Sequence, residues 1–303
     1  MIIITGISGF VGCNLRSYLC EKEKPTLGVS RNPNIDEVHY SEINKTLLNN
    51  INCFIRLAGK AHDLKKSSDD KEYYKVNTEL TKKLYNHFLE STCEVFIYMS
   101  SVKAVADFTQ DVLTEDVSPN PITAYGKSKL AAEEYILSKK IPKNKRVYIL
   151  RPSMIHGPNN KGNLNLLYNF ISIGIPYPFG KYVNKRSFVS VDNLCFIINE
   201  LINNHKIESG IYNIADDISL STIDLVQLIS EVLCKPTRIL KVPKFIIRFI
   251  AKVGDVLPFP ISSERLLKLT ENYEVSNLKI KNAIQKRLPL SSKDGIEKTV
   301  TSF

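Results

Sequence analysis

The stretch Ile2-Ile3-Ile4-Thr5-Gly6-Ile7-Ser8-Gly9-Phe10-Val11-Gly12 places a short β-branched run directly before three regularly spaced glycines. Residues 2–5 are predicted to form a strand, and Leu15 and Leu19 beyond the glycines have the spacing of a helix. Glycines let the backbone turn tightly and approach a pyrophosphate, whose charge is then met by N–H groups at the helix start. The stretch therefore predicts a dinucleotide site rather than a merely structural turn, formed by Gly6, Gly9, Phe10, Val11 and Gly12.

Strand and helix patterns alternate along the chain after this turn. Apolar runs bounded by turn residues predict strands at 26–30, 53–58, 94–99 and 146–150, and helical periodicity predicts helices at 72–90 and 124–138. This alternation predicts an α/β fold with a Rossmann-type, doubly wound parallel sheet, in which ligands bind beyond the carboxyl ends of the strands.

The remaining segments predict a second, smaller body. Residues 151–185 are rich in Gly, Pro and Asn, as is typical of loops around a substrate cleft. The runs at 186–191 and 210–215 are predicted to be strands that return to the sheet, and helices follow from about residue 219. We therefore assign residues 1–160, with 185–217 returning, to a dinucleotide-binding domain. A smaller C-terminal substrate-binding lobe takes residues 218–303, with 161–184 contributing.

The residues at the end of the second strand bear on the choice of cofactor. An acidic side chain there would hold the ribose 2′-hydroxyl of NAD, but the chain has Ser30 and Arg31. A guanidinium can pair with the 2′-phosphate of NADP. We therefore predict NADP, with NAD as the alternative. The competing interpretation of Arg31 is an arginine exposed in a loop.

Tyr125 and Lys129 are four residues apart in a predicted helix, so their side chains share one face. A lysine ammonium beside a tyrosine favours the phenolate, which lowers the phenol's pKa and suits proton exchange with a substrate. Ser101 follows the strand predicted at 94–99 and is expected to meet the tyrosine. The competing interpretation is a solvated helical face that carries this pair by chance.

Composition and charge narrow the classes of partner. The chain has 303 residues, of which 43% are hydrophobic and 24% charged, and no apolar run is long enough to cross a bilayer. The net charge of +10 comes from lysines spread along the chain, which favours a phosphorylated small substrate over nucleic acid. The six cysteines lack metal-ligand spacing, so we expect no metal site and reduced thiols in a cytoplasmic protein. The first apolar residues are interpreted as a strand and not as a signal peptide.

Taken together, these residues resemble the extended short-chain dehydrogenase/reductase family, which contains NAD-dependent epimerases, dehydratases and reductases of nucleotide-activated sugars. The resemblance covers nearly the whole chain, with its motifs in family order and spacing. They are the three glycines, Leu57-Ala58-Gly59, Asn77, Ser100-Ser101, Tyr125-x-x-x-Lys129, Arg151-Pro152, Gly157-Pro158, Arg186 and Asp192-Asn193-Leu194.

The resemblance implies a role for each matching residue. Ser101 would hold the substrate oxygen, Tyr125 would transfer its proton, and Lys129 would bind the nicotinamide ribose while lowering the tyrosine pKa. The implied cofactor contacts also include Leu57, Ala58, Gly59 and Asn77. The implied substrate contacts are Arg186 at the diphosphate, Arg265 as a second candidate there, Lys103 and Asn163.

Some residues of the resemblance distinguish between the reactions that the family catalyses. Family 4,6-dehydratases carry Asp-Glu after the active-site Ser or Thr, whereas Val102-Lys103 follows Ser101 here. The chain is most similar to a polysaccharide-biosynthesis branch, although 104–106 and His156 depart from usual patterns. That branch includes reductases of UDP-4-keto-6-deoxy-N-acetylglucosamine and chains labelled UDP-glucose or UDP-N-acetylglucosamine 4-epimerases. We predict the NADPH-dependent reductase, with the 4-epimerase and a noncatalytic sensor or scaffold as alternatives, and a homodimer as the assembly.

A basic, apolar segment lies at 244–252. Lys244, Arg248 and Lys252 are spaced four apart and are predicted to form a basic stripe opposite Phe245, Ile246, Phe249 and Ile250. We predict an ordinary amphipathic helix that packs its apolar side on the lobe, with a membrane-surface helix as the alternative.

Overall fold

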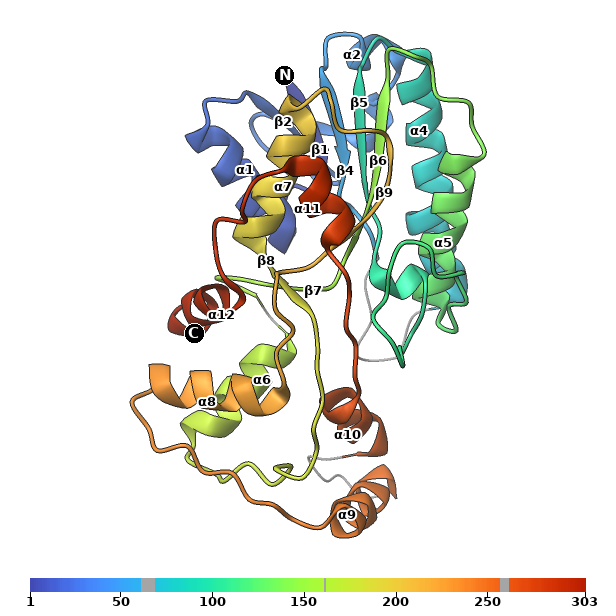
Figure 1. Ribbon diagram of the computed structural model, residues 1–303. Helices are drawn as coiled ribbons and strands as arrows, with labels where there is room; N and C mark the ends of the chain where they lie inside the picture. Colours follow the sequence, from blue (N-terminus) through green and yellow to red (C-terminus); the bar gives the residue numbers. More distant parts are fainter. Residues whose placement is uncertain (61–68, 161, 257–261) are drawn as a thin grey trace.

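The computed structural model describes residues 1–60, 69–160, 162–256 and 262–303, and its centre is one seven-stranded sheet (Figure 1). All neighbouring strands are parallel, in the order β3-β2-β1-β4-β5-β6-β9. The direction of winding reverses between β1 and β4, so the predicted doubly wound Rossmann-type sheet is confirmed. The strands are β1 (Ile2–Thr5), β2 (Thr26–Ser30), β3 (Glu37–His39), β4 (Cys53–Arg56), β5 (Val95–Met99), β6 (Arg146–Pro152) and β9 (Gly210–Ile214).

Helices cover both faces of this sheet, so its strands are apolar on both sides. Strand β1 shows the alternation: Ile2 and Ile4 pack with Leu15 and Leu19 on one face, whereas Ile3 faces the other core cluster. The first face carries α1 (Phe10–Glu21), α7 (Val191–Asn203) and α11 (Leu278–Ile284). The second carries α2 (Lys45–Leu48), α4 (Leu80–Glu90) and α5 (Ala124–Leu137).

Three local predictions differ from the structure. The run at 186–191 does not return to the main sheet, because its strand β8 (Phe188–Ser190) pairs with β7 (Met154–His156) in a separate two-stranded sheet. The edge position beside β6 is filled by β9 instead. Strand β3 was missed, since it has three residues and follows a turn-rich segment. The helix predicted at 72–90 is divided into α3 (Asp70–Tyr73), a π-helical turn η2 (Tyr74–Glu79) and α4.

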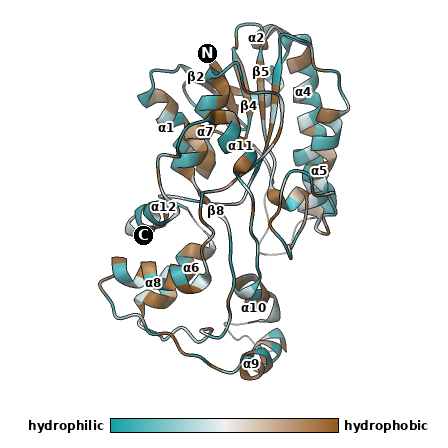
Figure 2. Cartoon of the chain, in the orientation of Figure 1, coloured by the Kyte–Doolittle hydropathy of each residue, from teal (hydrophilic) through white to brown (hydrophobic). Residues whose placement is uncertain are grey.

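Below the sheet in Figure 1, five helices surround a further apolar cluster that includes Phe188, Leu225 and Ile296. They are α6 (Asn163–Ser172), α8 (Thr222–Val232), α9 (Lys244–Val256), α10 (Ser263–Thr270) and α12 (Ser292–Thr301). Figure 2 shows these helices with mixed hydropathy, unlike the strongly apolar strands of the sheet. Helix α11 was predicted within this lobe, but Ile280 and Ile284 pack in the sheet's core cluster. The division of the chain into two domains remains a prediction.

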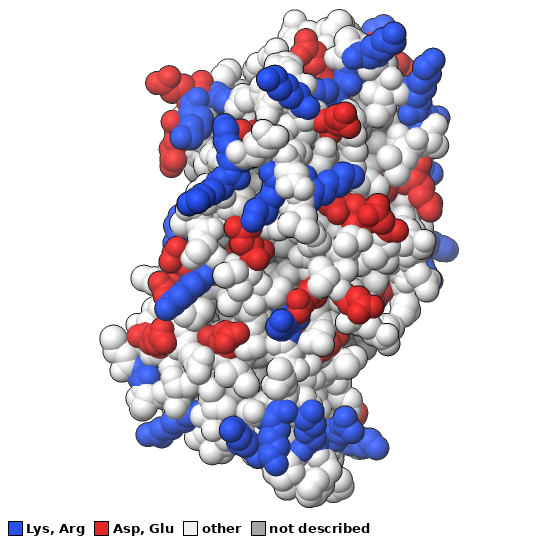
Figure 3. All heavy atoms as spheres, viewed as in Figure 1, with Lys and Arg blue, Asp and Glu red and all other residues white. Residues whose placement is uncertain are grey.

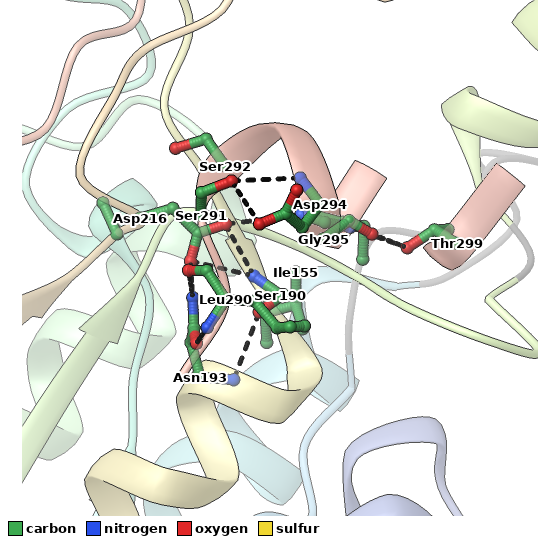
Figure 4. A network of polar contacts seen from close by, with 12 residues as sticks. Ile155, Ser190, Asn193, Asp216, Leu290, Ser291, Ser292, Asp294, Gly295 and Thr299 are labelled. Carbon is green, nitrogen blue, oxygen red and sulfur yellow. Dashed lines mark hydrogen bonds and ion pairs between the residues drawn. The ribbon is translucent and has the colours of Figure 1, made fainter. Parts of the chain in front are cut away.

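The segment Asp192-Asn193-Leu194 has a structural role at the start of α7, where a polar network joins three parts of the chain (Figure 4). The Asn193 side chain donates to the Asp216 carboxylate at 2.7 Å and to the Leu290 carbonyl at 2.9 Å. It also accepts from the Leu290 N–H at 3.0 Å. Asp216 in turn accepts from the Ser190 N–H. This buried network holds the segment that precedes α12, at Leu290, against the residues that follow β9, at Asp216.

Candidate active site

The glycine turn between β1 and α1 can be formed only with glycine at two positions. Gly6 has a φ of +73°, which L side chains rarely adopt, and a Cβ at Gly12 would lie 2.2 Å from the Gly6 carbonyl oxygen. Gly9 caps α1 without a side-chain hydrogen bond, and the first turn holds no acidic residue. The start of α1 thus has no side-chain cap from Gly9 and no acidic residue in its own first turn, and the turn fits a dinucleotide pyrophosphate.

Ser30 and Arg31 lie one strand away, because β2 pairs with β1 in parallel register. The Ser30 hydroxyl is buried and makes no hydrogen bond within the described residues. Arg31 is exposed. Burial raises the pKa of the nearby Tyr40, and the positive charges of Arg56 and Arg31 lower it in part. The end of β2 therefore offers a hydroxyl and a guanidinium, a donor set that fits a ribose carrying a phosphate.

The predicted residues Gly59, Asn77 and Lys129 meet at one junction. A Cβ at Gly59 would lie 3.0 Å from Lys129 Nζ and 3.2 Å from Asn77 Oδ1. Asn77 Oδ1 accepts from the Lys60 N–H at 2.8 Å, and its amide donates to Ser128 Oγ at 3.0 Å. Asn77 lies in the π-helical turn η2, a distortion that is frequent at functional sites. The end of β4 is thereby fixed to the start of α5.

Tyr125 stands in the first turn of α5, which begins at the N-cap Thr123. Gly126 lets this turn approach closely, since a Cβ there would lie 2.3 Å from the Lys103 carbonyl oxygen. The Tyr125 ring is half-buried and edge-on to Tyr73, with 6.4 Å between the ring centroids. Burial raises the pKa of Tyr125, and a hydrogen bond with the Ser101 side chain lowers it in part. The structure thus places the side chains of the predicted serine and tyrosine next to each other.

Lys129 is 4% exposed, and its ammonium donates to the Met99 carbonyl at 2.8 Å. The pKa of Lys129 is lowered to about 7, mainly by burial and in part by the positive Arg56, while Glu133 opposes both effects. The side chain that lowers the pKa of Tyr125 here is Ser101, and a contribution of Lys129 to that pKa remains a prediction. Lys129 is itself a buried group whose pKa of about 7 places its titration near neutral pH.

Sequence reasoning missed two sets of buried charges beneath these residues. Arg56 is fully buried and donates to the carbonyls of Ala58 and of Val76, the latter at 2.8 Å. Glu133 accepts from Arg151 at both carboxylate oxygens: Nη2 donates to Oε2 at 2.5 Å, and Nε donates to Oε1 at 3.2 Å and to Oε2 at 3.1 Å. The signals were present, as an arginine inside the apolar run 53–58 and a glutamate one helical turn after Lys129.

Two of the predicted substrate residues gather around a residue that the sequence did not indicate, Tyr273. The Lys103 ammonium lies 4.4 Å from the centroid of the Tyr273 ring and donates to the Asp107 carbonyl. The backbone of Arg186 is bridged to Tyr273, and its largely buried guanidinium lies 3.8 Å from the Glu271 carboxylate. Burial lowers the pKa of Arg186, and Glu271 opposes that effect. Both cations therefore belong to one patch beside Tyr273.

The other two predicted substrate residues lie on helices α10 and α6. Arg265 is exposed on α10, where its N–H donates to the N-cap Ser262 at 3.3 Å. Asn163 is the first residue of α6, and its side chain lies outside the described part of the chain. Their proposed contacts with a diphosphate or a sugar remain predictions.

The chain is similar to known proteins in sequence and in fold. The family model described as "NAD dependent epimerase/dehydratase family" matches residues 2–215. The chain is similar to a UDP-glucose 4-epimerase of Vibrio cholerae, at 30% identity over 100% of this chain and 95% of the relative. It is also similar to a GDP-6-deoxy-D-talose 4-dehydrogenase of Aggregatibacter actinomycetemcomitans, at 26% identity over 76% of this chain and 79% of that protein.

Solved structures agree on the fold. A UDP-glucuronic acid 4-epimerase from Bacillus cereus, solved in complex with NAD, superimposes with a TM-score of 0.74. The match covers 99% of this chain and 97% of the other at 19% identity. At this identity the likeness shows a shared fold and nothing finer.

Proposed function

Because the chain belongs to the NAD-dependent epimerase/dehydratase family, we propose that it catalyses hydride transfer at C4 of a nucleotide-diphospho-sugar with NAD(P). The observation that carries the proposal is the contact of Ser101 with the half-buried Tyr125 on the helix that also holds the buried Lys129. A hydroxyl pair of this kind can bind a single substrate oxygen and exchange a proton with it. The bound nicotinamide would supply or remove the hydride.

Each of the chain's own groups then has one task. The turn Gly6 to Gly12 would hold the pyrophosphate, and the end of β2 would hold the ribose. Ser101 Oγ would orient the oxygen at C4, and Tyr125 Oη would give a proton to that oxygen or take one from it. Lys129, fixed by the Met99 carbonyl, would position a ribose hydroxyl next to the tyrosine.

For the direction of the reaction, we propose reduction of a UDP-4-keto-6-deoxy-N-acetylhexosamine with NADPH, as in surface polysaccharide biosynthesis. Arg31 supports this choice, since it is exposed where an acidic residue would favour NAD. Val102 and Lys103 after Ser101 leave no carboxylate there for dehydration. A 4-epimerase is the second candidate, because a relative that aligns with the whole chain is a UDP-glucose 4-epimerase.

The two candidates differ in what happens to the cofactor. A reductase consumes one NADPH in each turnover, whereas an epimerase removes and returns the hydride and keeps its NAD. Purified protein should be given NADPH with UDP-4-keto-6-deoxy-N-acetylglucosamine, and separately NAD with UDP-glucose or UDP-N-acetylglucosamine. We expect NADPH oxidation in step with loss of the keto sugar.

Other outcomes would redirect the proposal. Protein that leaves NADPH untouched yet equilibrates a UDP-sugar with its C4 epimer would be the 4-epimerase. Protein that is inert in both assays, although it binds cofactor, would be the noncatalytic alternative. Tyr125→Phe should lose the activity, and its matched control is Tyr135→Phe. That control removes a hydroxyl from the same helix α5, where it donates to Asn86 at 2.8 Å, and should retain activity.

A further inference from the structure

Helix α9 turns its apolar side away from the protein. Ile247 is 3% exposed and Ala251 1% exposed, so these two residues mark the side that packs on the lobe. At about 100° per residue, the opposite side of the helix carries Phe245, Phe249 and Val256. They are 73%, 68% and 84% exposed. The prediction that the phenylalanines pack on the lobe is therefore wrong, because periodicity identifies a shared side and not its neighbour.

One flank of this apolar side is basic. Lys244, Arg248 and Lys252 are all exposed, and Figure 3 shows Lys and Arg side chains gathered along the end of the molecule that carries α9. The Lys244 ammonium lies 5.2 Å from the centroid of the Tyr182 ring, so its stem follows the lobe surface. Asp255 is tied to α10 by accepting from the Ser263 N–H at 2.8 Å and its hydroxyl at 2.6 Å.

We propose that α9 docks the protein on the surface of an anionic lipid bilayer. Helices that lie in the headgroup region have this construction, with large apolar side chains facing the acyl boundary and Lys or Arg beside them at the headgroups. An anionic bilayer suits this helix, because three cations flank its apolar side and the chain as a whole carries a net charge of +10. Among the described residues no helix has the length and apolar character to cross a bilayer, so the attachment would be peripheral.

The contributions of the apolar side chains and of the cations to bilayer binding can be separated experimentally. The intact protein is sedimented with vesicles of pure phosphatidylcholine, or of equal parts phosphatidylcholine and phosphatidylglycerol, at low and at high salt. We expect it to bind the anionic vesicles at low salt and to be released as salt screens the headgroups. Phe245→Ser with Phe249→Ser should weaken the partition at least about tenfold. Arg248→Gln and Lys252→Gln should each weaken it about fivefold.

Phe108→Ser is the matched control, because Phe108 is 61% exposed and lies outside α9, and its partition should equal that of the wild type. Retained cofactor binding shows that a variant is folded, and the charge variants test the proposal even if the phenylalanine pair misfolds. Wild-type protein that stays in the supernatant with anionic vesicles would overturn the proposal. So would equal partition of all variants. Dimers in light scattering that the phenylalanine pair converts to monomers would instead assign this side to a second copy of the chain.

Discussion

Replacing Glu133 by glutamine should destabilise the folded protein by about 3–5 kcal/mol, the usual cost of removing one partner of a buried ion pair. The Glu133 carboxylate is completely buried and accepts from Arg151 Nε and Nη2, and the Ser100 hydroxyl donates to it as well. Glutamine keeps nearly the same volume, but it has one acceptor oxygen in place of two and no charge. The Arg151 guanidinium, itself 2% exposed, would then be a buried cation facing an amide.

This cost is large against the whole stability of a domain, which is about 5–15 kcal/mol. Equilibrium unfolding in urea, followed by far-ultraviolet circular dichroism, should show a lower midpoint for the variant by on the order of 1–2 M. Glu134→Gln is the matched control, since Glu134 is the exposed neighbour in the same helix and should change stability by less than about 0.5 kcal/mol.

A second variant separates the charge from the packing. Glu133→Met combined with Arg151→Met removes both charges and should recover most of the loss, because apolar replacement of a buried pair is often neutral. The reasoning is refuted if Glu133→Gln unfolds within about 1 kcal/mol of the wild type. It is also refuted if the double variant is less stable than the single one, since the cost would then come from lost packing.

Three further predictions concern the cofactor and the lysine. Relative to Lys129→Met, the wild type should gain up to about 1.4 kcal/mol of stability per pH unit between pH 7 and 10. The lysine of the unfolded chain keeps its proton in that range, while the lysine of the folded chain has lost it. Urea unfolding that gives the same stability difference between the two proteins at every pH would contradict this prediction. Gly12→Ala should weaken binding of the cofactor at least about tenfold in a fluorescence titration, because its Cβ meets the Gly6 carbonyl. Gly210→Ala, whose Cβ would lie at an ordinary contact distance of 4.0 Å from Lys279 Nζ, should bind the cofactor normally. Equal affinity of the two variants would be evidence against a cofactor-binding role for the turn. Arg31→Ser should weaken NADPH binding about 10- to 100-fold and leave NADH binding unchanged. An equal loss for both cofactors would mean that Arg31 does not select the 2′-phosphate.

Most of the sheet could be predicted because its strands are continuous apolar runs that end at glycine or polar turns. The run Ile2 to Thr5 is buried on both faces, and its burial alternates between two core clusters. Strand β3 escaped prediction because its three residues, two half-buried and one exposed, do not form such a run. Residues 186–191 have the composition of a strand, but which partner they pair with depends on the place taken by β9.

Part of the site could be predicted as well, because some of its residues are placed by local sequence spacing. Tyr125 and Lys129 share a helical face by local spacing alone, and Ser101 follows from the end of β5. The position of Tyr273 beside the site could not be predicted, because its contact with Lys103 joins residues far apart in the sequence. The pKa of Lys129 could not be found either, since it depends on burial and on Arg56, which only the folded chain places nearby.

The measurement that tests the central claim most directly is the single-turnover reaction of Tyr125→Phe with bound cofactor and its sugar nucleotide. The variant lacks the hydroxyl that contacts Ser101 but keeps the half-buried ring beside Tyr73. We predict that hydride transfer slows by about 10²- to 10⁴-fold while the cofactor binds with unchanged affinity, as expected for loss of the proton-transfer group. Hydride transfer within about tenfold of the wild-type rate would contradict the assignment of Tyr125 as the group that exchanges the proton.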